Sequence, residues 1–447
     1  MLLPPKTGAG VKAMFASSLR KRGQFFLLLS RCGKLKQPAN EQHTHGATFV
    51  RRRRAGLVDR RSRRLDDHPI RKRPCVQKEK AFVMSRPIYA EIDLNALRHN
   101  LARIRECAGD RDVWAVVKAN AYGHGLENAV AAFADADGLA TIDLCDAERA
   151  RKSGWQKRIL LLEGFFDEGD IEPLQRLKVE TIIHSPWQIE ILRRMKIEDV
   201  RCHIKVNSGM NRLGFLPVEV NTVYDQLTSI PGVRVMGVVT HFANAEPSYS
   251  SDKPASVDKQ LSRMGRLAHS ATAACMANSA GILFHPEVGG NAVRGGIALY
   301  GVSPDSHISS EELGLIPAMT LKAKIIAIQE ISAGEAVGYG SRWVAKRPSR
   351  IAVVACGYAD GYPRSMPDGA PVWVEGQIAP LAGAVSMDML EIDVTDIPAA
   401  KLGSEVELWG RNLPVNRVAA ACGTIGYELL CALARRVPVR VNEGAEN

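Results

Sequence analysis

The sequence lacks the features by which several large classes of protein are recognised. Near the N-terminus its longest purely apolar run is the five residues 25–29, far short of the roughly 20 residues that a membrane-spanning helix needs. This run follows three basic residues, but it is shorter than the apolar core of a signal peptide, and no clear cleavage pattern comes after it. The sequence therefore favours neither a membrane anchor nor secretion.

Paired cysteine motifs are also missing. The 447 residues include nine cysteines and no Cys-x-x-Cys pair, a pattern that predicts neither a disulfide framework nor a zinc ribbon. Reduced, mostly buried thiols fit better, and they indicate a cytoplasmic location. No metal site is predicted, because His124, His184 and His285 are interpreted as ordinary structural residues.

Positive charge is concentrated at one end of the chain. The whole sequence has 59 Lys and Arg against 48 Asp and Glu; residues 1–83 hold 21 against 5, which leaves 38 against 43 for 84–447. We expect the basic leader 1–83 to be disordered, because blocks of like charge stay solvated. Few aromatic residues accompany its arginines, which argues against base stacking. We expect no nucleic-acid or membrane partner, and a start at Met84, where the periodic sequence begins, fits this interpretation.

Residues 84–318 show the alternation of strand and helix that is typical of a (β/α)8 barrel. Apolar and polar residues alternate over 88–92, which predicts a half-buried strand, and Asp93 is placed to cap a helix that begins at Leu94. An open doubly wound sheet is disfavoured, because no Gly-x-Gly-x-x-Gly follows the first strand. Further apolar runs predict strands at 113–118, 138–142, 158–162, 180–184, 202–206, 235–240, 282–285 and 297–300.

The pattern changes from about Met319. Short runs rich in Val and Ile, at 351–355, 371–374 and 404–409, are separated by Gly, Pro and Asp turns, which is typical of an all-β domain. The sequence therefore predicts a mostly β C-terminal domain over 319–447. Catalytic residues of a barrel lie at the C-terminal ends of its strands, so the polar residues that end the apolar runs are the candidates for chemistry.

One of these runs, 114–118, ends in Lys118, and this lysine has two interpretations. It can form a structural ion pair, because buried charges are normally paired. Alternatively, burial lowers its pKa and makes it a nucleophile, able to form a Schiff base with a carbonyl cofactor such as pyridoxal phosphate. The residue type alone leaves both open.

Several motifs follow one another in order along 84–447, and together they resemble the alanine racemases, a barrel-type family of pyridoxal phosphate enzymes. The motif around the lysine reads Val-Val-Lys-Ala-Asn-Ala-Tyr-Gly-His-Gly. The others lie at 206–214, 240–243, 278–280, 294–297, 337–340, 357–362, 385–388 and 423–427. The resemblance implies an isomerase that interconverts L-alanine and D-alanine.

The resemblance also implies a two-base mechanism. Lys118 is the Schiff-base lysine and one of the two bases, and Tyr339 is the second base, on the opposite face of Cα. A tyrosine with the ordinary pKa of about 10 is a weak base at neutral pH, and the family places a histidine, here His241, beside it and towards Arg294. In the family the tyrosine comes from the partner subunit, so a head-to-tail homodimer is expected.

The remaining site residues are assigned by the same resemblance. Arg294 faces the pyridine nitrogen and weakens the cofactor as an electron sink, because an arginine keeps its proton. Arg212 meets the substrate carboxylate, Met387 contributes backbone to the carboxylate site across the dimer, and Lys205 matches a lysine that carries a carbamate in many members. The cofactor-binding set is Lys118, Tyr122, His241, Ser279, Arg294, Gly296, Ile297 and Tyr362, with the phosphate held by Tyr122, Ser279, Gly296, Ile297 and Tyr362.

Three alternatives remain open at this point. Ala384 stands where many members have arginine, which allows a broader-specificity amino-acid racemase. A non-catalytic pyridoxal phosphate-binding protein would share the barrel and the lysine, but it would lack the second domain and Tyr339. A barrel-type decarboxylase is disfavoured by Arg294, because decarboxylation benefits from a stronger electron sink. The residues do not distinguish D-alanine biosynthesis for the cell wall from alanine breakdown.

Overall fold

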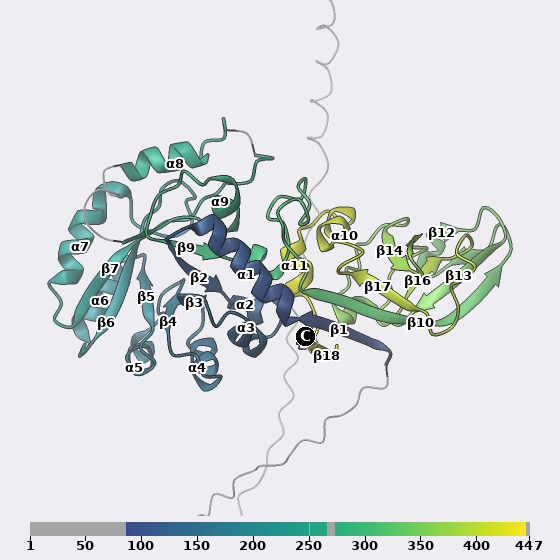
Figure 1. Cartoon of the computed structure of the whole chain (residues 1–447), viewed down its shortest axis with the longest axis horizontal. Helices are drawn as coiled ribbons and strands as arrows, with labels where there is room; N and C mark the ends of the chain where they lie inside the picture. Colours follow the sequence, from purple (N-terminus) through teal and green to yellow (C-terminus); the bar gives the residue numbers. More distant parts are fainter. Residues whose placement is uncertain (1–85, 250, 266–272, 444–447) are drawn as a thin grey trace, which may run out of the picture. The chain divides into compact units, whose positions relative to one another are not determined.

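The computed structural model describes residues 86–249, 251–265 and 273–443, so the predicted leader 1–83 lies outside the described residues. The described residues belong to one compact unit, Glu79–Asn447. A closed barrel of parallel strands comes first and a mostly β domain follows it, as predicted (Figure 1). None of the helices in the described part is long and apolar enough to cross a membrane.

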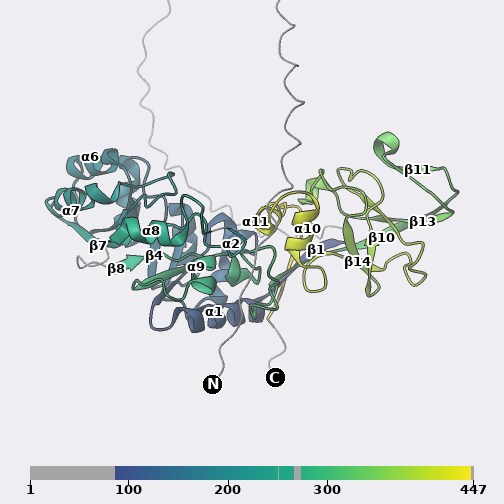
Figure 2. The ribbon, with the colours of Figure 1, turned by 90° about the horizontal axis from the view of Figure 1, so that it is seen from above.

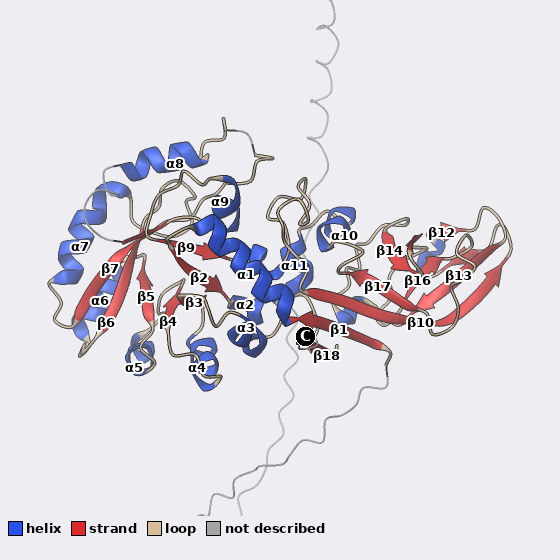
Figure 3. Ribbon diagram, viewed as in Figure 1, coloured by secondary structure: helices blue, strands red, loops and turns tan. Residues whose placement is uncertain are grey.

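Eight strands form the barrel; each pairs in parallel with the next, and the last pairs with the first. Helices connect successive strands and lie outside them, as the blue helices around the red strands in Figure 3 show. The strands are β2 (Asp112–Val116), β3 (Gly138–Thr141), β4 (Arg158–Leu161), β5 (Glu180–Ile183), β6 (Val200–Lys205), β7 (Val233–Val239), β8 (Ala273–Cys275) and β9 (Ala292–Gly295). The helices that connect them include α3 (Leu126–Ala132), α4 (Leu144–Lys152), α5 (Ile171–Arg176), α6 (Pro186–Arg194), α7 (Val220–Thr228), α8 (Val257–Met264) and α9 (Ser279–Phe284).

The structure confirms the first six predicted barrel strands and shows that the last two predictions were wrong. The run at 282–285 lies mostly in α9, and the run at 297–300 forms the 3-10 helix η4 (Ile297–Tyr300). Ile282 and Ile297 are nevertheless buried. A short buried apolar run has the same composition in a helix as in a strand, so composition could not separate them. The true strands, β8 and β9, are three and four residues long.

The strand predicted at 88–92 exists, but it lies outside the barrel. β1 (Ile88–Asp93) pairs antiparallel with β10 (Met319–Ile331) and parallel with β18 (Val439–Asn442), and Figure 2 shows β1 beside β10. The sheet of the second domain therefore contains the strand that precedes the barrel. α1 (Leu94–Ala108) begins where predicted, and the Asp93 carboxylate accepts a hydrogen bond from the third backbone N–H of the helix at 3.0 Å.

The second domain is built on the long strand β10, which pairs with β1, β13 and β17. The three predicted runs form β13 (Ser349–Val354), β14 (Pro371–Val374) and β17 (Glu405–Trp409). The other strands are β11 (Ala336–Val337), β12 (Trp343–Val344), β15 (Gln377–Pro380) and β16 (Leu390–Asp393). Two helices, α10 (Val415–Ala421) and α11 (Gly426–Cys431), complete it, and α11 packs against α2 (Lys118–Tyr122) at the barrel.

Candidate active site

Lys118 begins α2, separated from the end of β2 by one residue, at the C-terminal end of a barrel strand. The four residues after it, Ala119 to Tyr122, have φ between 51° and 54° and so form a left-handed turn, at a cost of roughly 1–2 kcal/mol per residue. The buried His124 holds this turn: its Nδ1 donates to the carbonyl oxygens of Ala121 at 3.1 Å and Tyr122 at 3.0 Å. Such strain persists only where surrounding structure enforces it, and it is concentrated at functional sites.

Positive side chains gather at this end of the barrel. Burial lowers the pKa of Lys118, and the charges of Arg212 and Arg294 lower it further against the opposing effect of Glu163. Burial, followed by the charges of Arg294 and Arg212, lowers the pKa of Lys205 at the end of β6 to about 7. Both amines therefore lose their protons more readily than an exposed lysine does, and the site as a whole attracts anions.

Arg294, on β9, is only 4% exposed and is fixed by backbone carbonyls. Its Nη1 donates to the carbonyl oxygen of Cys275 at 2.7 Å, and its Nη2 donates to that of Thr240 at 2.6 Å. Nη2 also lies 3.3 Å from Nδ1 of His241. No hydrogen bond within the described residues uses the Arg294 Nε, so this N–H is the one left for an outside acceptor.

His241 is a neutral histidine of defined tautomer. Burial, together with the charges of Arg294 and Lys205, lowers its pKa well below the ordinary value. Because the Arg294 guanidinium can only donate, Nδ1 of His241 accepts, and the single ring proton lies on Nε2. The ring can therefore donate one hydrogen bond from Nε2.

A cradle of hydroxyl and backbone groups lies at the start of α9. The Ser279 Oγ accepts from the backbone N–H of Gly296 at 2.9 Å and of Ala298 at 3.3 Å. A Cβ at Gly296 would come within 3.0 Å of the Tyr122 hydroxyl and 3.7 Å of Ser279 Oγ, so the three residues adjoin. Ile297 follows, fully buried, at the start of η4. Hydroxyls and backbone N–H groups suit a phosphate, and the cradle therefore fits the phosphate of pyridoxal phosphate.

Within the described residues, Tyr362 forms no hydrogen bond or ring contact with this cradle. Tyr362 is 1% exposed in the β domain, where its ring stacks on Trp409 at 6.2 Å between centroids. A tyrosine of the β domain that does lie beside Tyr122 is Tyr427 of α11, whose ring centroid is 6.1 Å from that of Tyr122. Tyr427 belongs to a motif that sequence reasoning recognised without giving this residue a role. Only the packing of α11 on α2 reveals the contact.

Two predicted site residues lie on the β domain and are exposed. Tyr339, in the short helix η5 (Tyr339–Ser341), is 73% exposed, and Met387 is 52% exposed. Among the described residues the Tyr339 hydroxyl has no hydrogen-bond partner, so no hydrogen bond joins it to Lys118 within one chain. Arg212 is exposed as well.

A (β/α)8 barrel with a strand-end lysine, a phosphate cradle and an appended β domain defines a barrel-type pyridoxal phosphate enzyme. Comparison with known families makes this specific. Residues 92–304 match the model for the alanine racemase N-terminal domain, and residues 318–441 match that for the alanine racemase C-terminal domain. The chain belongs to the alanine racemase family.

Individual relatives are similar over nearly their whole length. The chain is 49% identical over 358 residues to an alanine racemase of Janthinobacterium sp. (strain Marseille), which covers 80% of this chain and 99% of that protein. It is 46% identical over 359 residues to the catabolic alanine racemase of Klebsiella aerogenes, with the same coverage. The crystal structure of the biosynthetic alanine racemase from Pseudomonas aeruginosa superposes with a TM-score of 0.76 at 44% identity, covering 80% of this chain and 100% of that one.

Proposed function

We propose that this chain interconverts L-alanine and D-alanine with pyridoxal phosphate as its cofactor. One observation carries the proposal: Lys118, partly buried and with a lowered pKa, shares one end of the barrel with the Ser279–Gly296 cradle. The cradle suits the phosphate, and the lysine suits the carbonyl of the same cofactor. When bound, this cofactor withdraws electrons from the substrate Cα and so acidifies its hydrogen.

The proton is moved by two bases on opposite faces of Cα. The lowered pKa of Lys118 favours a neutral amine, which accepts or returns the proton on one face. Tyr339 of the partner subunit acts on the other face, and its exposure on the β domain leaves it free to reach a second chain. The Nε2–H of His241 is the donor that would stabilise this tyrosine as a phenolate.

Arg294 sets the type of reaction. Its free Nε–H would be the donor for the pyridine nitrogen of the cofactor, and because a guanidinium keeps its proton, that nitrogen would stay unprotonated. A weaker electron sink favours return of the proton to Cα over transamination.

Arg212 would bind the substrate carboxylate, for which its planar fork of donors is well suited. Lys205, with a pKa of about 7, is partly neutral at physiological pH. A neutral amine adds carbon dioxide at Nζ and releases a proton, and the carbamate formed reverses the charge of this side chain. A negative group there would hold Arg212 in place.

We assign the phosphate to Tyr122, Ser279, Gly296, Ile297 and Tyr427. Tyr427 replaces Tyr362 in the set expected from the sequence, because the Tyr427 ring lies beside Tyr122 whereas the Tyr362 ring stacks on Trp409. A homodimer and a reducing, cytoplasm-like location complete the proposal. The exposed Tyr339 supports the first, and the seven cysteines of the described residues, all free thiols, support the second.

Borohydride reduction tests the cofactor and its anchor together. We expect it to fix pyridoxal phosphate covalently to Lys118, as peptide mass spectrometry would show, and Lys118→Ala to lose racemisation. Full racemisation by Lys118→Ala would contradict the proposal. Rates with the enantiomers of alanine, serine and lysine, in the natural chain and in Ala384→Arg, test specificity; equal rates with all three amino acids would favour a broader racemase.

Mixed dimers test whether the site is shared between subunits. Lys118→Ala and Tyr339→Phe are each expected to lose most activity alone. If each site takes Lys118 from one chain and Tyr339 from the other, a heterodimer of the two variants regains one intact site. Activity should therefore reappear on mixing and subunit exchange. No recovery in heterodimers of confirmed composition would show that the two residues act within one chain.

A further inference from the structure

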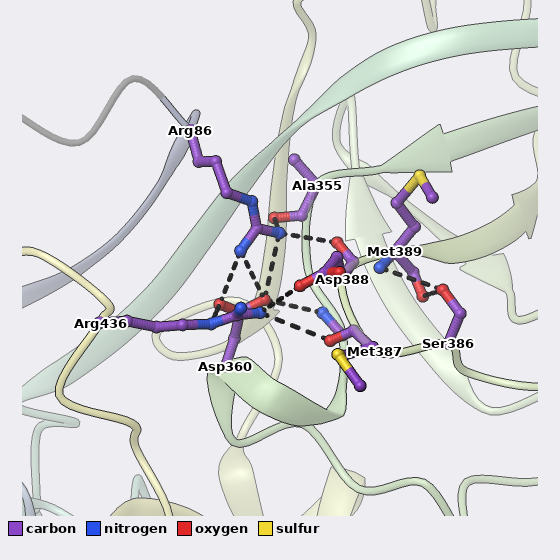
Figure 4. Close-up of polar contacts among 9 residues, drawn as sticks. Arg86, Ala355, Asp360, Ser386, Met387, Asp388, Met389 and Arg436 are labelled. Atoms are coloured by element: carbon purple, nitrogen blue, oxygen red, sulfur yellow. Dashed lines mark hydrogen bonds and ion pairs between the residues drawn. The ribbon is translucent and has the colours of Figure 1, made fainter.

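Two arginines far apart in the sequence hold one buried carboxylate in the β domain (Figure 4). Asp360, at the end of the short helix η6 (Tyr358–Asp360), has a side chain that is 0% exposed. Arg86 Nη1 donates to Asp360 Oδ1 at 3.0 Å, and Arg436 Nε donates to the same oxygen at 2.7 Å. We call these three residues the Asp360 clamp.

Both arginines of the clamp also reach one turn, residues 386–389. Arg86 Nη2 donates to the carbonyl oxygen of Asp388 at 2.7 Å. Arg436 Nη2 donates to Asp388 Oδ1 at 2.8 Å and lies 3.4 Å from the carbonyl oxygen of Met387. In Figure 4 dashed lines join each of the two guanidinium groups both to the Asp360 carboxylate and to this turn.

Every carbonyl of the turn has a donor. Those of Ser386 and Met387 each accept from a backbone N–H of η6 at 3.0 Å. The carbonyl oxygen of Asp388 accepts from Arg86, and that of Met389 accepts from Ser386 N at 2.9 Å, which closes the turn. By contrast, no described residue accepts a hydrogen bond from the backbone N–H of Met387.

The turn is also packed tightly against η6. A Cβ at Gly357 would lie only 2.4 Å from the carbonyl oxygens of Ser386 and Met387, so backbone meets backbone there. With all four carbonyl directions fixed, the peptide planes cannot rotate independently. The unpaired Met387 N–H therefore keeps one orientation, in a residue that is half exposed.

We propose that the Asp360 clamp positions the 386–389 turn so that the Met387 N–H binds the substrate carboxylate in the partner subunit's site. The inference rests on the function proposed above, in which Met387 completes that site across the dimer. It adds three positioning residues that do not touch substrate. Because the carboxylate is common to both enantiomers, the clamp should govern the KM of L-alanine and D-alanine alike.

Arg436→Gln and Asp388→Ala test the clamp without removing the buried Asp360. Each removes the hydrogen bond between Arg436 and the Asp388 side chain, and Arg436→Gln also weakens the hold on Asp360. We expect KM to rise about tenfold for both enantiomers, because the loss of a hydrogen bond to a charged group weakens binding by about this factor. We expect kcat to change less than about twofold. Inhibition by propionate, which has the carboxylate but no amine, should weaken in parallel. Cofactor absorbance should not change, because Lys118 and the cradle are on the barrel.

Arg347→Gln is the matched control, because Arg347 forms an exposed ion pair with Asp396 in the same domain. It should leave KM unchanged. An unchanged KM in both clamp variants, or a fall in kcat at constant KM, would contradict the proposal. If a variant is merely less stable, its thermal midpoint falls while KM and propionate inhibition stay normal. This outcome would also contradict the proposal.

Tagged heterodimers locate the effect. With Lys118→Ala in one chain and Arg436→Gln in the other, the working site uses an intact turn, so KM should be normal. With both substitutions in one chain and an unaltered partner, the working site uses the altered turn, and KM should rise about tenfold. The reverse pattern would place the effect within one chain and overturn the proposal. If the unaltered protein does not racemise alanine, the proposed function itself is overturned. If a clamp variant racemises alanine with a normal KM, only the role of the clamp is overturned.

Discussion

At the scale of single residues, the site contains lysine amines whose pKa is lowered by burial. Lys205 is the strongest case, with its pKa lowered from 10.5 to about 7. Between these two values the unfolded chain binds the proton and the folded chain does not. The contribution of Lys205 to the free energy of unfolding therefore increases as pH rises from about 7 to about 10. Below pH 7 the folded chain also binds the proton, and the cost of burying the charged amine is present in full.

Lys205→Met should remove this dependence. We expect the variant to be more stable than the natural chain below pH 7 in buffer free of carbon dioxide, and the difference to shrink towards pH 10. Urea unfolding at several pH values measures it, with the exposed Lys401→Met as the control. Added bicarbonate should stabilise only the chains that keep Lys205, since a carbamate removes the buried positive charge. A pH-independent difference would contradict the lowered pKa.

Residue types alone predicted the site unevenly. Lys118 was recognisable, because a lysine at the end of an apolar run is unusual and the motif around it is long. Tyr427 was not, because its place beside Tyr122 depends on two helices some 300 residues apart in sequence. Tyr362 illustrates the converse: a tyrosine in a recognisable motif is buried against Trp409 in the β domain.

At the scale of elements, the left-handed turn after Lys118 carries measurable strain. Ala119 has φ of 53° and is exposed, so glycine can replace it without losing a packed side chain. We expect Ala119→Gly to stabilise the protein by up to about 1 kcal/mol, and Ala119→Val to destabilise it by about 1–2 kcal/mol, because a β-branched residue strongly disfavours this region. Urea unfolding measures both, and equal effects of Gly and Val would show that the turn is not strained.

The opposite end of the barrel contains an ion network that should affect stability but not catalysis. Burial alone raises the pKa of a carboxyl group, but hydrogen bonds from His203 and Arg158 outweigh it and lower the pKa of Glu180 to about 2. This stabilisation is fully present above pH 4.5 and is lost as pH falls through about 2. Glu180→Gln should cost about 3 kcal/mol at pH 7, less as pH falls below 4.5, with kcat and KM unchanged. A change in KM would place Glu180 at the site.

Element prediction succeeded where apolar periodicity was long and failed where strands were short. α1 could be predicted from its cap and its apolar stripe, since Leu97 and Ile104 are fully buried. β8 reads Ala-Ala-Cys and β9 includes a buried arginine, so neither resembles an apolar strand. Their place is set by closure of the barrel, which no local run of residues encodes.

At the scale of the whole molecule, every predicted site residue comes after the basic leader in the sequence. The predicted site residues run from Lys118 to Met387, and Tyr427 extends them. We expect a chain that starts at Met84 to racemise alanine with the same kcat and KM as the full chain. A chain that starts at Pro87 lacks Arg86 and should show the raised KM of the clamp variants. Steady-state kinetics on the two truncations tests both, and a loss of activity on removing 1–83 would give the leader a role.

The pairing of β1 with β10 and β18 has a consequence for how the protein is made. A ribosome synthesises β1 before the barrel and β18 more than 340 residues later. The barrel strands, β2 to β9, are complete well before then, whereas β1 stays without its second neighbour until synthesis reaches Asn442. Folding during translation should therefore finish the barrel first and the sheet last. The protein then joins the first and the last strands of its described residues in a single sheet.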